Sequence, residues 1–179
     1  MLHGTSVIAT GGDVIATFIH GSGAYDDYLY LASPSNAYQN ANTSTVGSNW
    51  IFQNHLSSVG DTVNLGNFAA GTELIFNVLA GPNFGLDLNW YTGPSSRNSD
   101  GYAHAWVDAS YTGPYGGTAV GFEDLSGLGD AGYEDLLYTF SNVTNNLNSS
   151  KKALGVKTTQ AGTRYEWPHR PVWGIWPPS

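Results

Sequence analysis

Hydrophobic positions in this chain come in short runs rich in valine, isoleucine, threonine, tyrosine and phenylalanine, separated by clusters of glycine, asparagine, serine, aspartate and proline. No apolar pattern with a helical period persists for three turns. Short runs at such close intervals predict an all-β chain folded as a two-sheet β-sandwich with jelly-roll-like connections. The expected strands cover residues 6–10, 14–20, 28–33, 50–53, 62–65, 73–79, 86–91, 102–108, 118–122 and 136–140.

The expected strand over residues 102–108 has two different faces. Tyr102, His104 and Trp106 point one way, and the alanines and the valine between them point the other way. Either the small residues pack against the second sheet and the aromatic face forms a surface ridge, or the aromatic face belongs to the core. The pattern leaves both arrangements open.

The last part of the chain has a different composition from the rest. A polar run at residues 145–150 marks the expected boundary between a β-sandwich domain, residues 1–147, and a tail, residues 148–179. The tail is basic at first and then rich in tryptophan and proline, and its prolines exclude a helix or a central strand. We therefore expect an extended tail whose tryptophans dock on the domain, on a second copy or on a partner.

Charge is distributed unevenly over the 179 residues, whose net charge is -8. Before Lys151 the only Lys or Arg is Arg97, whereas every acidic residue except Glu166 precedes that point. Nucleic-acid binding is therefore not expected, because contacts to phosphates need a basic surface. The chain has no cysteine, so disulfides, cysteine metal sites and thiol catalysis are excluded.

No stretch of the sequence approaches the roughly 20 apolar residues of a membrane-spanning helix. The first residues, 1–4, lack the basic and apolar regions of a secretory signal. A secreted or cell-surface location therefore implies a signal that is not present in this chain, and the alternative is a protein that stays inside the cell.

One turn occurs twice in the sequence. Residues 21–30 and 129–138 align without a gap, and each runs from a glycine-rich acidic loop into an apolar strand. Carboxylates crowded into such a loop repel one another unless a hard cation lies among them, and calcium accepts irregular oxygen geometry. The candidate calcium ligands are Glu123, Asp124, Asp130, Glu134 and Asp135 around the second copy, and Asp26 and Asp27 in the first.

The first copy of the turn is open to a simpler interpretation. Asp26 and Asp27 are its only acidic residues, and aspartate side chains in turns commonly accept hydrogen bonds from backbone amides two residues on. Turn formation alone is therefore the stronger interpretation of the first copy, and metal binding is the stronger interpretation of the second.

The run Gly121-Phe122-Glu123-Asp124-Leu125, followed by residues 129–137, resembles the signature of the DUF4114 family. That signature combines GFEDL with a D-x-D-[YF]-N-D pattern, and the resemblance covers about residues 14–143. It implies a calcium-binding module of bacterial extracellular or surface proteins, with no established catalytic activity. Glu123, Asp124, Asp130 and Asp135 match the acidic positions of the family and Tyr133 its aromatic position, while Gly132 and Glu134 replace an Asp and an Asn.

Enzymatic chemistry has little support in the sequence. The paired carboxylates cluster in a turn, whereas glycosidases place theirs across a cleft. A zinc site of Asp100 and His104, with Asp87 or His20, lacks a close histidine pair. No GxSxG, HExxH or P-loop motif occurs. We therefore expect a protein that is not an enzyme.

A calcium-dependent carbohydrate-binding module is the main alternative to a calcium-binding module that acts in adhesion or assembly. Trp90 and Tyr91 are candidates for stacking on a sugar ring, and Arg97 and Asp100 for polar contacts, although a salt bridge between the latter two is the simpler interpretation. A third interpretation is a subunit that self-assembles through residues 151–179. The expected partners are accordingly a surface glycan, a protein or a second copy of the chain.

Overall fold

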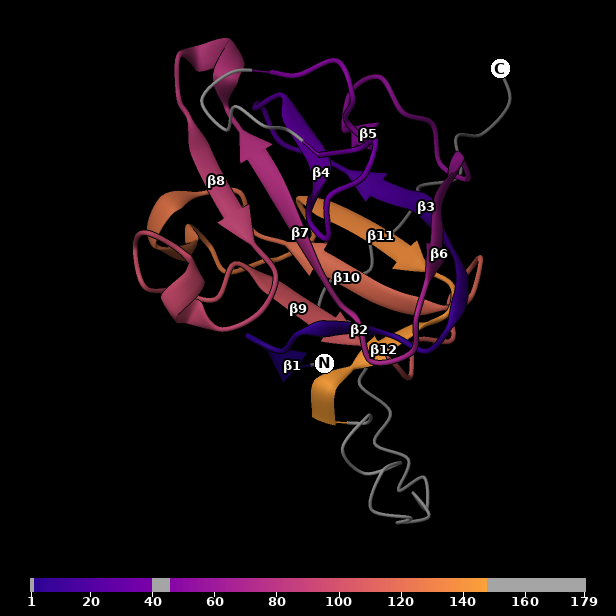
Figure 1. Ribbon diagram of the computed structural model, residues 1–179. Coiled ribbons are helices and arrows are strands. Elements are labelled where there is room, and N and C mark those ends of the chain that lie inside the picture. Colours follow the sequence, from indigo (N-terminus) through magenta and orange to yellow (C-terminus); the bar gives the residue numbers. More distant parts are fainter. Residues whose placement is uncertain (1, 40–45, 148–179) are drawn as a thin grey trace, which may run out of the picture.

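The computed structural model describes residues 2–39 and 46–147 of the chain. Within them, two antiparallel sheets form a sandwich, and the connections contain only short helical turns (Figure 1). The all-β, two-sheet prediction is therefore confirmed. Predictions about the tail concern residues outside the described part of the chain.

The first sheet contains six strands, and residues 123–135, which include the acidic loop of the second copy of the turn, connect two of them. In spatial order its strands are β1 (Leu2–His3), β9 (Ala105–Asp108), β10 (Thr118–Phe122), β11 (Leu136–Phe140), β3 (Gly12–Gly21) and β6 (Thr62–Phe68).

The second sheet packs across the core from the first. In spatial order its strands are β12 (Val143–Asn145), β2 (Val7–Ala9), β7 (Glu73–Ala80), β4 (Asp27–Ser33) and β5 (Phe52–Gln53), with β8 (Leu88–Tyr91) also paired to β7.

Each expected strand is present, with ends that differ by a few residues. Two further short strands, β1 and β12, lie outside the predicted ranges. Strand β9 begins three residues later than expected, because Tyr102 lies in a turn in which its amide donates to Asp100 Oδ1 (3.0 Å).

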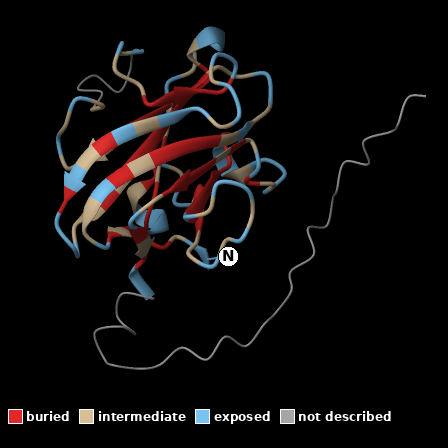
Figure 2. Cartoon of the chain, turned by 90° about the vertical axis from the view of Figure 1, so that its right-hand side faces the viewer, coloured by how far each residue is buried: buried red, intermediate tan, exposed pale blue. Residues whose placement is uncertain are grey.

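The core is formed by the alternate residues of facing strands, and buried positions follow the strands of both sheets (Figure 2). Phe76 of β7 stacks on Phe140 of β11, with ring centroids 4.3 Å apart, so the two sheets are in direct contact. In β9, Ala105 and Val107 belong to this core, while Trp106 is buried on the other face of the sheet in a smaller cluster. The small-residue face of this strand is thus the one that points inward.

The two copies of the duplicated turn lie side by side at one end of the sandwich. Strand β3 pairs with β11 so that Gly21 lies opposite Leu136, and the amide of Ser22 donates to the carbonyl oxygen of Asp135 (2.8 Å). After β3 the chain crosses from the first sheet to β4 of the second. Acidic residues from both sheets are therefore brought to the same end of the fold.

Candidate metal centre

Three carboxylates meet where β10 ends and β11 begins. Glu123 and Asp124 directly follow β10, and Asp135 directly precedes β11. Phe122 pairs with Leu136 in the antiparallel ladder, so the residues next to this pair are neighbours in space. One carboxylate oxygen from each of the three acidic residues lies within 4.8 Å of the others.

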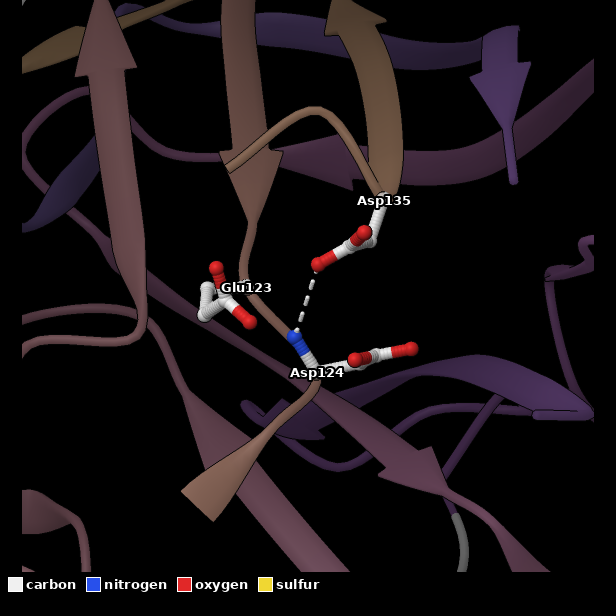
Figure 3. A group of neighbouring side chains, drawn as sticks. All are labelled: Glu123, Asp124 and Asp135. Carbon is white, nitrogen blue, oxygen red and sulfur yellow. Dashed lines mark hydrogen bonds between the residues drawn. The ribbon is translucent and has the colours of Figure 1, made fainter. Parts of the chain in front are cut away.

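The three side chains approach the same stretch of backbone from different sides. Figure 3 shows Asp135 reaching from the start of β11 toward the backbone nitrogen of Asp124, with the carboxylates of Glu123 and Asp124 on either side. The amide of Asp124 donates to Asp135 Oδ2 (3.3 Å). The carboxylate of Glu123 accepts hydrogen bonds from the amides of Leu125 (3.3 Å) and Gly132 (3.1 Å), so it is held by the loop between β10 and β11.

Asp27 adds a fourth carboxylate from the second sheet. It is the first residue of β4 and is 0% exposed. Its Oδ2 accepts from Asn54 Nδ2 (3.2 Å), but its Oδ1 is buried and has no hydrogen-bond partner among the described residues. Burial is the largest cause that raises the pKa of Asp27, and the charge of Asp124, a side-chain hydrogen bond with Asp124 and the charge of Asp135 raise it further, so this carboxyl group lies beside that of Asp124. A buried oxygen without a partner is costly, and here it lies beside like charges.

The cluster is electrostatically unbalanced. Burial and the neighbouring carboxylates raise the pKa of Glu123 to about 7, and the pKa values of Asp124 and Asp135 also lie above their usual range for the same reasons. Arg97 is the only Lys or Arg in the described part of the chain, and it pairs with Glu73 (3.2 Å) instead of the cluster. Apart from His20, whose charge lowers the pKa of Asp135, these charges must therefore be balanced by bound protons or a cation.

The other predicted ligands lie outside the buried cluster. Asp130 and Glu134 are exposed on the loop above it, and Asp130 Oδ1 accepts from the amide of Gly132 (3.0 Å). Asp26 lies 2.9 Å from His55 Nδ1 and accepts from Gln53 Nε2 (3.2 Å). The first copy of the turn is therefore divided, because Asp26 has local partners whereas Asp27 joins the carboxylates of the second copy.

The residues predicted to contact a sugar are used in other ways. Trp90 is 1% exposed and stacks on His104, with ring centroids 3.7 Å apart and planes at 2°. The prediction that Trp90 stacks on a sugar is wrong, because the indole ring is buried. Tyr91 is partly buried on β8.

Arg97 and Asp100, which were candidates for polar contacts to a sugar, have different partners in the structure. Arg97 pairs with Glu73 (3.2 Å), and Asp100 contacts His104 instead of Arg97, with its Oδ2 2.8 Å from His104 Nε2. The other ring nitrogen of His104, Nδ1, lies 2.9 Å from the carbonyl oxygen of Glu123. Because both ring nitrogens have partners within the protein, the zinc site considered for Asp100 and His104 is not formed.

Sequence reasoning missed that Trp90 and His104 contact the acidic turn. Both side chains reach backbone carbonyl oxygens, at Asp124 and Glu123 respectively. A carbonyl oxygen is present at every residue, so no residue pattern marks such a contact in advance.

Comparisons of the chain with known protein families, with curated proteins and with solved structures find no match. The resemblance to the DUF4114 family therefore stays a prediction that depends on the motif residues alone. No helix in the described residues is long and apolar enough to cross a membrane.

Proposed function

We propose that this chain is a non-catalytic calcium-binding module in which the ion connects the two sheets of the sandwich. The proposed ligands are the carboxylates of Asp27, Glu123, Asp124 and Asp135. The observation that carries the proposal is the group of Glu123, Asp124 and Asp135, whose carboxylate oxygens lie within 4.8 Å of one another, together with the fully buried Asp27 beside Asp124, whose Oδ1 accepts no hydrogen bond from the described residues. A cation among these oxygens would give Asp27 Oδ1 a partner and remove the repulsion.

The donor set favours calcium over other metals. Carboxylate oxygens suit hard cations, whereas zinc and copper prefer nitrogen and sulfur ligands. Magnesium usually retains several waters in octahedral geometry. Glu123 is 0% and Asp124 4% exposed, so their burial favours an ion that takes most of its ligands from the protein.

The position of the site supports a structural role for the ion. Asp27 begins β4 of the second sheet, while Asp124 and Asp135 flank β10 and β11 of the first. An ion bound to all three would link the two sheets where the chain makes its acidic turns. Such a module fits an extracellular or cell-surface protein that acts in adhesion or assembly, where calcium sites of modest affinity suffice.

Thermal unfolding of the full chain tests the proposal. An ion at about 100 times its dissociation constant stabilises the folded state by roughly 2.7 kcal/mol. For a chain of this length we expect calcium to raise Tm by about 5–10 °C over the value in chelator. Magnesium at the same concentration serves as the control and should give a smaller shift. An unchanged Tm in millimolar calcium would contradict the proposal.

A further inference from the structure

We infer that Trp90 and His104 are positioning residues that set the calcium affinity of the carboxylate cluster by holding the backbone of Glu123 and Asp124. This inference depends on the proposed function. The side chains of Trp90 and His104 contain no oxygen atom that could bind calcium. Both residues therefore act through the two acidic residues whose backbone they hold.

The contacts involve two consecutive carbonyl groups. The indole N–H of Trp90 donates to the carbonyl oxygen of Asp124 (2.6 Å), and His104 Nδ1 lies 2.9 Å from that of Glu123. A carbonyl oxygen only accepts, so Nδ1 carries the proton in this contact. The amide of Glu123 donates back to the carbonyl oxygen of His104 (3.0 Å). The backbone at both acidic residues is therefore fixed by buried hydrogen bonds.

The two rings support each other across the sandwich. Trp90 lies on β8 of the second sheet, and His104 directly precedes β9 of the first. Their planes are almost parallel, and both side chains are buried. Each ring limits the rotation of the other, so the donors stay directed at the two carbonyl groups.

Asp100 extends this arrangement to the loop that follows Asp124. Its Oδ2 lies 2.8 Å from His104 Nε2 and also accepts from the amide of Gly127 (2.9 Å). The segment from Glu123 to Gly127 is thus held at both ends by one connected set of side chains. We call Trp90, His104 and Asp100 the brace.

The brace explains how adjacent residues can direct their carboxylates to one ion. Glu123 and Asp124 lie on either side of Asp135, an arrangement that requires a defined backbone orientation (Figure 3). Residues that orient metal ligands typically change metal affinity by 10-fold to 100-fold when they are mutated. A side chain that only fills the core would alter stability but leave the affinity for calcium unchanged.

The test compares two substitutions that each remove a side-chain donor to a backbone carbonyl group. Trp90→Phe removes the donor to the carbonyl oxygen of Asp124, whereas Tyr30→Phe removes a hydroxyl that donates to the carbonyl oxygen of Gly47 (3.2 Å) and accepts from its amide (3.1 Å), away from the carboxylates. Calcium affinity is measured by calorimetric titration of the full chain, and stability by melting in chelator. We expect Trp90→Phe to weaken calcium binding by about 10-fold or more and Tyr30→Phe to leave it within about twofold of wild type.

A second variant, Asp100→Asn, tests the brace if Trp90→Phe fails to fold, because Asp100 lies nearer the surface. We expect it to weaken calcium binding by about 10-fold, the lower end of the range for residues that orient metal ligands. Wild-type affinity in every variant that folds would overturn the inference while leaving the proposed function intact. Absence of calcium binding by the wild-type chain would overturn both.

Discussion

Asp27→Asn is expected to make the metal-free protein more stable and to abolish its response to calcium. In the metal-free protein Asp27 is a buried carboxyl group beside Asp124 whose pKa is raised to about 9, so folding at pH 8 requires it to bind a proton; the neutral amide of asparagine needs no proton and can still donate to that carboxylate. We expect Tm in chelator at pH 8 to rise by about 2–4 °C, equivalent to about 1 kcal/mol for a chain of this length. The shift of about 5–10 °C expected from calcium should disappear, because an amide is a weaker ligand than a carboxylate.

Asp26→Asn is the matched control, since it makes the same chemical change at the adjacent residue. Asp26 pairs with His55 and Gln53 outside the cluster, so this variant should keep the full calcium response. The two variants are compared by melting in chelator and in calcium. Retention of the calcium shift in Asp27→Asn, with its loss in Asp26→Asn, would show that the cluster is not the metal site.

The metal-free protein is expected to lose stability as the pH rises from about 5 to 8. Burial raises the pKa of Glu123 to about 7 and shifts those of Asp27 and Asp124 in the same direction, whereas carboxyl groups in the unfolded chain titrate near pH 4. Between these values the folded state binds protons that the unfolded state has released. The stabilisation is therefore complete below about pH 4 and is lost as the pH rises through the folded-state pKa values.

Calcium should remove this pH dependence, because the ion takes the place of the protons. The measurement is denaturant unfolding of metal-stripped protein at pH 5, 6, 7 and 8, with and without calcium. Each proton retained by the folded state contributes up to about 1.4 kcal/mol per pH unit. A metal-free stability that stays constant or increases over this range would show that the carboxylates are solvated like ordinary surface groups.

The strands could be predicted because their pattern is local. Alternation and turn residues locate β10 and β11 on either side of the acidic loop to within a residue. The late start of β9 could not be predicted, because it depends on Asp100 accepting from the amide of Tyr102. The sequence pattern also could not show which face of β9 points to the main core, because both faces are buried. Trp106 lies in a second cluster on the opposite face of the sheet.

The site could be predicted in part from the duplicated turn. Asp27 and Asp135 occupy the same position in the two copies, each at the start of a strand, and the fold brings both to the same end of the sandwich. Composition alone favoured a simple turn for the first copy, because the contribution of Asp27 depends on the crossing from β3 to β4. The roles of Trp90 and His104 depend on backbone acceptors, which no sequence pattern reveals.

The central claim is that calcium binds among the carboxylates of Asp27, Glu123, Asp124 and Asp135. Anomalous diffraction from crystals of the full chain grown with calcium tests this claim most directly. We predict an anomalous peak within about 2.3–2.6 Å of oxygens from Asp27, Glu123, Asp124 and Asp135, and its absence from crystals of Asp27→Asn. An empty cluster in calcium-grown crystals, with Asp27 Oδ1 hydrogen-bonded to a protein group or a water, would contradict the account.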